Sequence, residues 1–487
     1  MNPTLPDETS RLRQALVDQL VAEGWIRDPV IEDAFRRVPR HRFMPEAPLE
    51  AAYRDAQVIT KRDACGSSIS AVSAPWLQAH MLAEAALRPG QTVIEIGSGG
   101  CNAAYAAELV GPRGRIVTVD IDPFVTDRAT QFLADTGYTG VSVVLGDGGL
   151  EIREVPEGGA DAIIVTVEAQ DIPPAWIDQL AEGGRLVVPL RIHGYTWVIG
   201  FEKQRGLVVS RSFRVCQFVP MQGSGARNDI TMELRGGEIR IRFADGQPAD
   251  TSGLEEALRM PRHEQWTGIT IPGASSADTL LLWLATTLGG FCRLGVDPDS
   301  DTGLVDRSDG WDAAAIVRDS SLAYLLSRNI HTDSSRATTW EFGVHAFGPR
   351  AASLAQTMAQ QIVSWDRNLR SSDGPLIAVH AAKDVGRVPL AGRVLAKPHA
   401  RLVFDWAPGP ACARDGDSRS GQHQPAPLKQ EGDSAKERSC HNSGGWQGYC
   451  GLTTRFTDAV GGSCFRCSAM RSTPPLAGRP GTSRRCP

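Results

Sequence analysis

The sequence predicts an α/β protein, in which a doubly wound parallel sheet follows a helical N-terminal region and precedes a second α+β domain. Between residues 92 and 189, short runs rich in Val and Ile alternate with stretches of helical spacing. A turn with three glycines in four residues follows the first of these runs. From residue 228 onward, alternating polar and apolar strands are mixed with longer helices. Strands that alternate with helices form βαβ units, whose parallel sheet is covered on both faces.

Two helices are expected at the start, at residues 12–23 and 30–37, because Leu12, Leu16 and Leu20 recur at helical spacing. Strands of the parallel sheet are predicted at residues 92–96, 115–121, 141–145, 162–167 and 185–189. Helices are predicted at residues 76–87, 103–110, 123–136 and 174–180. Two further strands, at residues 196–201 and 207–214, complete this part of the chain.

A hairpin marks the start of the second domain. Residues 230–234 and 239–243 alternate polar and apolar side chains on either side of Gly236 and Gly237. After it we expect helices at residues 254–260, 279–288, 313–327 and 351–364. Strands are expected at residues 340–347, 376–380 and 401–406. Together these elements make an α+β domain of ordinary size.

The composition is that of a globular protein, with 41% hydrophobic and 22% charged residues. The net charge of −5 gives no attraction to nucleic acid or to an anionic membrane. The longest apolar run, at residues 280–288, is too short to span a bilayer. The polar start of the chain lacks the features of a secretory signal. We therefore expect a cytoplasmic protein that binds neither nucleic acid nor membrane.

The composition changes after Trp406. Gly, Pro and Ser supply 29 of the 80 residues from 408 to 487, and such a segment cannot build a core. Residues 407–487 are therefore predicted to be a disordered tail, or a stretch read out of its natural frame. Cys464 and Cys467 have the spacing of half a zinc site, but the irregular spacing of the other cysteines disfavours this alternative, and we expect no metal.

The glycine turn carries the chemistry. The strand at residues 92–96 runs into Gly97, Ser98 and Gly99, and a helix begins near Asn102. Glycines allow a tight turn against which a ligand can lie, and the amides of the helix would face that ligand. The spacing of a nicotinamide site fails, because Asn102 stands where the third glycine is required. Glu95, just before the turn, instead suits a ligand with a cationic amino group, such as the methionine part of S-adenosylmethionine.

Two more acids close the following strands. Asp120 ends the second strand, where it can accept hydrogen bonds from both ribose hydroxyls of a nucleoside. Asp147, followed by Gly148, ends the third strand and can accept a hydrogen bond from an adenine amino group. Acids at three consecutive strand ends predict S-adenosylmethionine as the cofactor. The alternative, that the glycines only permit close helix packing, does not explain these acids.

Further motifs occur in a fixed order, at residues 38–46, 52–55, 72–75, 146–148, 163–166 and 183–189. With them, residues 12–223 resemble protein-L-isoaspartate O-methyltransferases. The resemblance implies a Rossmann-like class I methyltransferase sheet that uses S-adenosylmethionine. The chain then divides into an N-terminal helical and substrate-side region (1–75), a cofactor-binding methyltransferase domain (76–224), an α+β accessory domain (228–406) and the tail.

Residues 172–176 and 218–223, together with the second domain, resemble the "FxLD system" branch of methyltransferases, which accompanies lanthipeptide-type biosynthesis. This resemblance implies a ribosomal precursor peptide as partner. We expect a carboxyl methyltransferase that tailors an aspartyl or isoaspartyl side chain through a methyl ester and a succinimide. The alternatives are general repair of isoaspartyl residues in proteins, and a non-catalytic scaffold that binds cofactor and peptide. The sequence leaves the oligomeric state open.

The resemblance also implies that Ser73, in a Ser-Ala-Pro motif, orients the substrate carboxylate. Ser70 is the alternative, because the sequence does not fix the register. A carboxylate with a pKa of about 4 is ionised at neutral pH, so no strong general base is needed. It is equally open that one of these serines caps the helix that begins near Pro75.

Four other positions need interpretation. Tyr53 and Asp55 precede the serine motif and either line the substrate cleft or form a turn. Cys101 stands where the family usually has an aromatic residue. Glu168 follows the fourth strand, where a small residue is usual, so it would either disturb the substrate edge or point to solvent.

Overall fold

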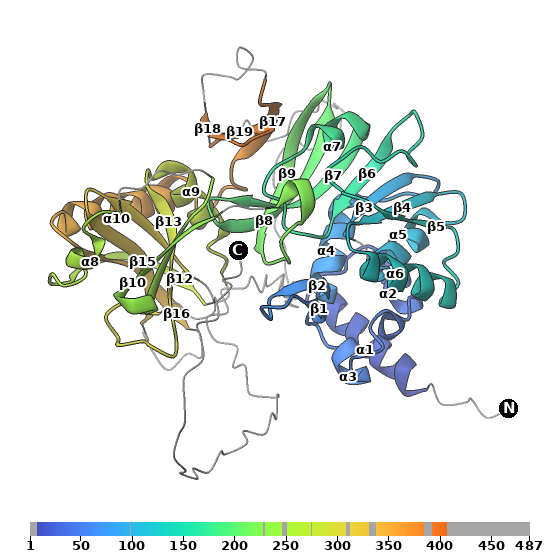
Figure 1. Ribbon diagram of the computed structural model, residues 1–487, viewed down its shortest axis with the longest axis horizontal. Coiled ribbons are helices and arrows are strands. Elements are labelled where there is room, and N and C mark those ends of the chain that lie inside the picture. Colours follow the sequence, from blue (N-terminus) through green and yellow to red (C-terminus); the bar gives the residue numbers. More distant parts are fainter. Residues whose placement is uncertain are drawn as a thin grey trace, which may run out of the picture.

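The computed structural model describes residues 7–97, 99–226, 229–245, 251–273, 275–307, 312–330, 338–383 and 392–406. Figure 1 shows two lobes side by side, the first built from the N-terminal half of the chain, with the last three strands at the top of the view near their junction. In the described part of the chain, no helix is long and apolar enough to cross a membrane. Ser98 and the tail at residues 407–487, with Cys464 and Cys467, lie outside the described residues.

Two capped helices open the first lobe. α1 (Glu8–Ala22) and α2 (Pro29–Arg37) follow Asp7 and Asp28, whose carboxylates accept hydrogen bonds from backbone amides of the first turn. Such caps satisfy amides that a helix start leaves unpaired. The predicted N-terminal helical region is therefore confirmed. It continues with elements that the sequence did not predict, η1 (Arg40–Phe43), α3 (Leu49–Ala52) and an antiparallel hairpin of β1 (Val58–Arg62) and β2 (Ser68–Val72).

A ten-stranded mixed sheet forms the centre of this lobe. Its elements are α4 (Pro75–Ala85), β3 (Thr92–Ile96), α5 (Cys101–Val110), β4 (Arg115–Asp120), α6 (Pro123–Asp135), β5 (Val141–Leu145), β6 (Ala160–Val165), α7 (Pro174–Gln179), β7 (Leu180–Ile192), β8 (Tyr195–Gln204), β9 (Leu207–Cys216), β17 (Leu376–Ala381), β18 (Arg393–Ala396) and β19 (Ala400–Asp405). The strand order is β18-β19-β17-β9-β8-β7-β6-β3-β4-β5. Strands from β7 to β5 are parallel and the others are antiparallel. This arrangement confirms the predicted α/β class.

The two faces of β3 determine where the site lies. Val93 packs in a core cluster with residues of α4 and α5, whereas Ile94 and Ile96 belong to a second cluster. Because side chains alternate along a strand, Glu95 lies on the same face as Val93. The neighbouring residue of β4 is Thr118, which has the same orientation. Both polar side chains therefore lie on the face that α5 covers.

A seven-stranded antiparallel sheet forms the second lobe. After η2 (Gly223–Gly225), its elements are β10 (Ile230–Leu234), η3 (Arg235–Gly237), β11 (Ile239–Phe243), α8 (Leu254–Ala257), β12 (His263–Pro272), α9 (Asp278–Thr287), β13 (Phe291–Val296), β14 (Ala313–Arg318), β15 (Ser321–Asn329), β16 (Thr339–Phe347) and α10 (Ala351–Asn368). The strand order is β10-β11-β13-β14-β15-β16-β12. The hairpin predicted across Gly236 and Gly237 is confirmed.

The helix predicted at residues 313–327 is wrong. The segment forms β14 and β15, joined by a turn in which Asp319 and Ser320 have φ angles of 50° and 54°. Two successive residues with positive φ match the twist of a tight hairpin. The alanines and leucines favour a helix locally, but most of these side chains are buried within the sheet, where packing overrides that preference.

The two lobes share one hydrophobic core. A single cluster of buried side chains includes Ile163 of β6 and Phe342 and Met358 of the second lobe. β17 pairs with β9, and Ile377 N donates to Ser210 Oγ at 2.8 Å. β19 then pairs with β17, and β18 pairs with β19. The sequence assigned residues 228–406 to one accessory domain. The strand pairing differs from this division, because β17, β18 and β19 extend the sheet of the first lobe.

Candidate active site

Two glycines of the turn between β3 and α5 adopt positive φ angles and are tightly packed. Gly97 has a φ of +96°, and a Cβ there would lie 2.5 Å from Thr166 Oγ1. Gly100 has a φ of +80°, and a Cβ there would lie 3.2 Å from the Phe43 ring. At Gly99 the nearest atom would be 3.9 Å away, so this glycine leaves space for a ligand. Packing therefore fixes the path of the turn beside the N-terminus of α5.

Glu95 is a buried acid with one unpaired oxygen. Thr118 Oγ1 donates a hydrogen bond to Glu95 Oε2, whereas Oε1 has no partner among the described residues. Asn102 Nδ2, on the first turn of α5, is a buried donor that also lacks a partner there. Burial raises the pKa of Glu95 to about 7, because the ionised form loses its hydration, and the nearby Thr118 and Asn102 donors offset only part of this rise. An unpaired acceptor and an unpaired donor at one site fit the ammonium and carboxylate groups of an amino acid.

Asp120 lies at the carboxyl end of β4, at the same edge of the sheet. Its Oδ1 accepts a hydrogen bond from Asp122 N at 2.9 Å. Asp122 caps α6 and forms an ion pair with Lys61 of β1, with 2.5 Å between Nζ and Oδ2. The ion pair holds the β1–β2 hairpin beside Asp120, so an element that the sequence did not predict borders the site.

Asp147 and Gly148, after β5, contact a segment that the sequence did not assign to the site. Ser224 N and Oγ donate to the Asp147 carboxylate at 2.8 and 3.1 Å, and Gly149 N donates at 2.9 Å. Trp176 Nε1 donates to the Gly148 carbonyl at 2.7 Å. Each carboxylate oxygen can accept about two hydrogen bonds, so Asp147 Oδ2 retains capacity for one more donor.

The structure separates the two candidate serines. Ser70 lies in β2, and its Oγ accepts a hydrogen bond from Thr60 Oγ1 on the paired strand at 2.9 Å. Ser73 lies in the turn between β2 and α4, and its carbonyl accepts a hydrogen bond from Arg40 Nη2 at 2.8 Å. The Ser70 hydroxyl is thus hydrogen-bonded within the hairpin, whereas at Ser73 it is the backbone carbonyl that a buried arginine holds.

Asp55 caps α4. Ala74 precedes the helix and provides no side-chain cap, whereas Asp55 Oδ1 accepts a hydrogen bond from Trp76 N at 2.9 Å. Burial raises the pKa of Asp55 to about 6. The interpretation of Ser70 or Ser73 as the cap is therefore wrong, because a residue about 20 positions earlier in the chain provides it.

Glu168 is buried, so the expectation that it points to solvent is wrong. Arg191 Nη1 lies 3.3 Å from Glu168 Oε1, and Thr196 Oγ1 donates to Oε2. The Glu168 backbone donates to the Val219 carbonyl at 2.8 Å and accepts from Met221 N at 2.9 Å. Glu168 thus fixes the segment that leads into η2 and its contact with Asp147.

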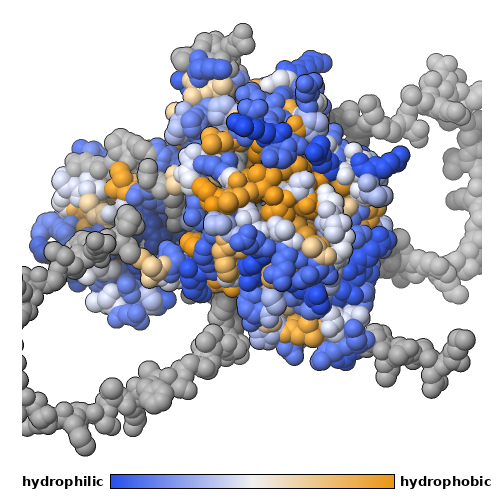
Figure 2. Space-filling view, turned by 45° about the vertical axis from the view of Figure 1, so that its right-hand side comes forward, coloured by the Kyte–Doolittle hydropathy of each residue, from blue (hydrophilic) through white to orange (hydrophobic). Residues whose placement is uncertain are grey.

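Apolar side chains surround the same edge of the sheet. Ile121, Phe124, Leu145 and Leu150 are exposed although large and hydrophobic. Leu145 is the last residue of β5, and the other three follow β4 or β5 within five residues of the strand end, near Asp120 and Asp147 in the sequence. Figure 2, which turns the first lobe forward, shows a broad apolar area among hydrophilic residues. Apolar surface of this kind is typical of binding regions.

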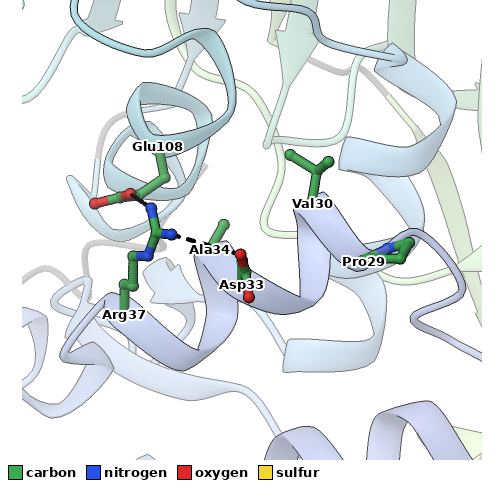
Figure 3. A pocket seen from close by; sticks show the side chains of 6 residues that line it. All are labelled: Pro29, Val30, Asp33, Ala34, Arg37 and Glu108. Atoms are coloured by element: carbon green, nitrogen blue, oxygen red, sulfur yellow. Dashed lines mark hydrogen bonds and ion pairs between the residues drawn. The ribbon is translucent and has the colours of Figure 1, made fainter.

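A small surface pocket lies elsewhere on the lobe, between α2 and α5 (Figure 3). Arg37 of α2 forms an ion pair with Asp33 on the same helix at 3.5 Å, and a second one with Glu108 of α5 at 3.2 Å, which joins the two walls. Glu108 is seven residues after Cys101 on α5, about 10 Å along the axis from the glycine turn, so this pocket is separate from the candidate site. Within the described ranges, no group of three His, Cys, Asp or Glu residues could hold a metal ion.

Comparisons with known proteins identify the family to which the chain belongs. The family model for protein-L-isoaspartate(D-aspartate) O-methyltransferase matches residues 10–226. The protein-L-isoaspartate O-methyltransferase of Methanopyrus kandleri is 37% identical over 217 residues, which are 44% of this chain and 92% of that protein. That of Ignicoccus hospitalis is 36% identical over 212 residues, which are 43% of this chain and 96% of that protein.

A solved structure of a beta-aspartate methyltransferase from Plasmodium falciparum, in complex with S-adenosyl-L-homocysteine, is 19% identical. It covers 43% of this chain and 98% of its own, with a TM-score of 0.38. The family match and the two archaeal relatives confirm the resemblance to protein-L-isoaspartate O-methyltransferases and the cofactor inferred from the sequence. The chain belongs to the protein-L-isoaspartate O-methyltransferase family, whose members transfer a methyl group from S-adenosylmethionine.

Proposed function

We propose that this methyltransferase esterifies an aspartyl or isoaspartyl side chain of a ribosomal peptide, and that the ester then closes to a succinimide. The observation that carries the peptide-tailoring proposal is the second lobe. Residues 229–405 lie beyond the family match, yet they share one core with the methyltransferase sheet and extend it by three strands. The archaeal relatives are covered to 92% and 96% of their length by less than half of this chain, so their activity needs no such lobe. Recognition of one particular peptide would give the lobe a role.

The cofactor supplies a methyl group on a positively charged sulfur. We assign Glu95 and Asn102 to its amino-acid part, since they present an unpaired buried acceptor and donor. Gly97, Ser98 and Gly99 would lie against the methionine part of the cofactor. Asp120 would accept hydrogen bonds from its ribose hydroxyls, and Asp147 and Gly148 would contact its adenine.

Ser73 is the residue to which we assign the acceptor carboxylate. Its hydroxyl can donate one hydrogen bond, which holds a carboxylate oxygen without removing much of its charge. The oxygen lone pair attacks the methyl carbon, the carbon–sulfur bond breaks, and no proton needs to be removed. The chain contributes alignment of the three reacting atoms and exclusion of water.

The second step uses the substrate's own backbone. The next backbone nitrogen attacks the ester carbonyl, a five-membered succinimide closes, and methanol leaves with the amide proton. The ester is a better electrophile than the carboxylate, so this ring closure needs no additional residue of the enzyme.

Ser73→Ala is expected to lower kcat about tenfold to hundredfold, because a hydrogen bond to a charged group contributes about 1.5–3 kcal/mol. The dissociation constant of S-adenosylmethionine should stay within about twofold. Ser70→Ala is the matched control, since its hydroxyl is engaged by Thr60, and its kcat should also stay within about twofold. A larger loss in Ser70→Ala than in Ser73→Ala would reverse the assignment.

Matched aspartyl and isoaspartyl peptides distinguish tailoring from repair. Each peptide is incubated with the full chain and S-adenosylmethionine, and products are followed by mass spectrometry, together with any precursor peptide encoded nearby. Tailoring predicts an ester on ordinary aspartate of the precursor that ages to a succinimide. Esterification of isoaspartate alone would favour general repair. The archaeal relatives are named as protein-L-isoaspartate O-methyltransferases. Cofactor binding without any ester would favour the scaffold alternative.

A further inference from the structure

Arg40 is an arginine buried beneath the candidate substrate turn. It is 1% exposed, and each nitrogen of its guanidinium has a protein partner. Nε donates to the Ala52 carbonyl at 3.0 Å, Nη2 donates to the Ser73 carbonyl at 2.8 Å, and Nη1 donates to Gln78 Oε1. A buried charge is expensive unless it is fully hydrogen-bonded, so the three partners together keep Arg40 in one position.

The guanidinium group joins segments that are far apart in the sequence. Ala52 ends α3, Ser73 lies in the turn after β2, and Gln78 lies on α4. Its donors lie in one rigid plane, so the three acceptors are held at fixed relative positions. On the other side of the turn, Asp55 accepts from Trp76 N. Ser73 is therefore held between two partly buried polar contacts, one at its carbonyl and one at the start of the following helix.

Gln78 extends this connection to the cofactor side. It is 3% exposed, and its side chain is a close neighbour of the thiol of Cys101, the first residue of α5. Burial raises the pKa of this thiol, so it is neutral and acts as a packing group. Cys101 directly follows the glycine turn. A line of contacts thus runs from the Ser73 carbonyl through Arg40 and Gln78 to the start of the helix that faces the cofactor.

We infer that Arg40 is a positioning residue that sets the distance between the acceptor carboxylate at Ser73 and the methyl group held at the glycine turn, acting through Gln78. This inference rests on the proposed role of Ser73. Methyl transfer needs three atoms in line, and a displacement of about 1 Å costs about a hundredfold in rate. The contact network acts on alignment, and neither Arg40 nor Gln78 needs to touch the substrate.

The test compares two arginines of the N-terminal region. Arg40→Lys keeps the charge but cannot reach three acceptors in one plane. Arg36→Lys is the matched control, because Arg36 also bonds three partners, Gln14, Asp18 and Glu32, but none of them near Ser73. With an isoaspartyl peptide, we expect kcat to fall about tenfold to hundredfold in Arg40→Lys, with a cofactor dissociation constant within about twofold of wild type. Arg36→Lys should keep the wild-type kcat, whether or not its Tm changes.

Substitution of Gln78 provides a rescue series. Gln78→Met removes the acceptor for Arg40 and should lower kcat about tenfold, whereas Gln78→Glu retains an acceptor and should restore most of it. The inference is overturned if Arg40→Lys has wild-type kcat, or if the two arginine variants lose kcat equally at equal Tm. If the wild-type chain forms no ester on any peptide, the proposed function itself fails, and the role of Arg40 fails with it.

Discussion

Glu95→Gln is expected to weaken S-adenosylmethionine binding about tenfold to hundredfold at pH 8. The substitution replaces a charge-assisted hydrogen bond to an ammonium group, which contributes about 1.5–3 kcal/mol, with one that is neutral. The amide that Glu95→Gln introduces can still accept from Thr118 through its oxygen, which then directs its NH2 group toward the cationic ligand. Isothermal titration calorimetry measures the dissociation constant directly.

The dissociation constant of S-adenosylmethionine should depend on pH through Glu95. Burial raises the pKa of Glu95 to about 7, so below pH 7 the free enzyme holds a proton that the cationic ligand must displace. The dissociation constant of the wild type should therefore rise up to about tenfold for each pH unit below 7 and level off above it. Glu95→Gln should remove this dependence. A wild-type dissociation constant that does not change between about pH 5.5 and about pH 8 would contradict the assignment of Glu95 to the cofactor's ammonium group.

The same substitution should stabilise the free enzyme. The pKa of Glu95 in the folded state lies above its ordinary value of 4.5, so its contribution to stability is present below about pH 4.5 and is lost as the pH rises through 7. At pH 8 the ionised carboxylate is buried at a cost that Gln does not incur. We expect Glu95→Gln to raise the Tm of the cofactor-free protein at pH 8, with the difference disappearing under acidic conditions. Affinity and stability thus change in opposite directions.

Ending the chain at residue 375 is expected to abolish soluble folded protein. This truncation removes β17, β18 and β19, with the buried side chains Ile377, Val379, Leu402 and Phe404. At about 1.5–3 kcal/mol each, their burial contributes about 6–12 kcal/mol, which is comparable to the whole stability of a typical domain.

Loss of Lys397 adds to this effect. Its buried ammonium group donates to the Arg191 carbonyl at 2.6 Å and to Asp245 Oδ1 at 2.5 Å. Without it, the Asp245 carboxylate stays buried with no ammonium partner from β18–β19, and a charge left without its partner costs several kcal/mol. Ending the chain at Trp406 is the control, and composition predicts that this shorter removal leaves folding intact. The amount of soluble protein and the thermal unfolding curve are measured for both truncations. A folded protein ending at residue 375 would contradict the shared sheet.

Periodicity predicted the elements that are regular and locally determined. The strands of the parallel sheet, the turn at Gly97 and the hairpin at Gly236 follow from side-chain alternation and from glycine placement. The strands at residues 313–329 could not be found in this way, because their alanines and leucines are equally consistent with a helix. Only the pairing of β14 with β13 and β15 decides between the two.

The contacts that organise the candidate site were the hardest to predict. Ser224 reaches Asp147 across 77 residues, Asp55 reaches Trp76 across 21, and Arg40 reaches Ser73 across 33. No sequence period reports such distances. The only hint in the sequence was position, since Arg40 and Asp55 lie in two of the motif segments that resemble the family, at residues 38–46 and 52–55.

Transfer of an isotope-labelled methyl group shows whether this chain esterifies a side-chain carboxylate. The full chain is incubated with methyl-labelled S-adenosylmethionine and an aspartyl or isoaspartyl peptide, and the peptide is mapped by tandem mass spectrometry. We expect label on the side-chain carboxylate in the wild type, followed by release of labelled methanol as the succinimide forms. Label should appear much more slowly in Ser73→Ala. Label on any other atom, or no label while the cofactor binds, would contradict the proposed carboxyl methylation.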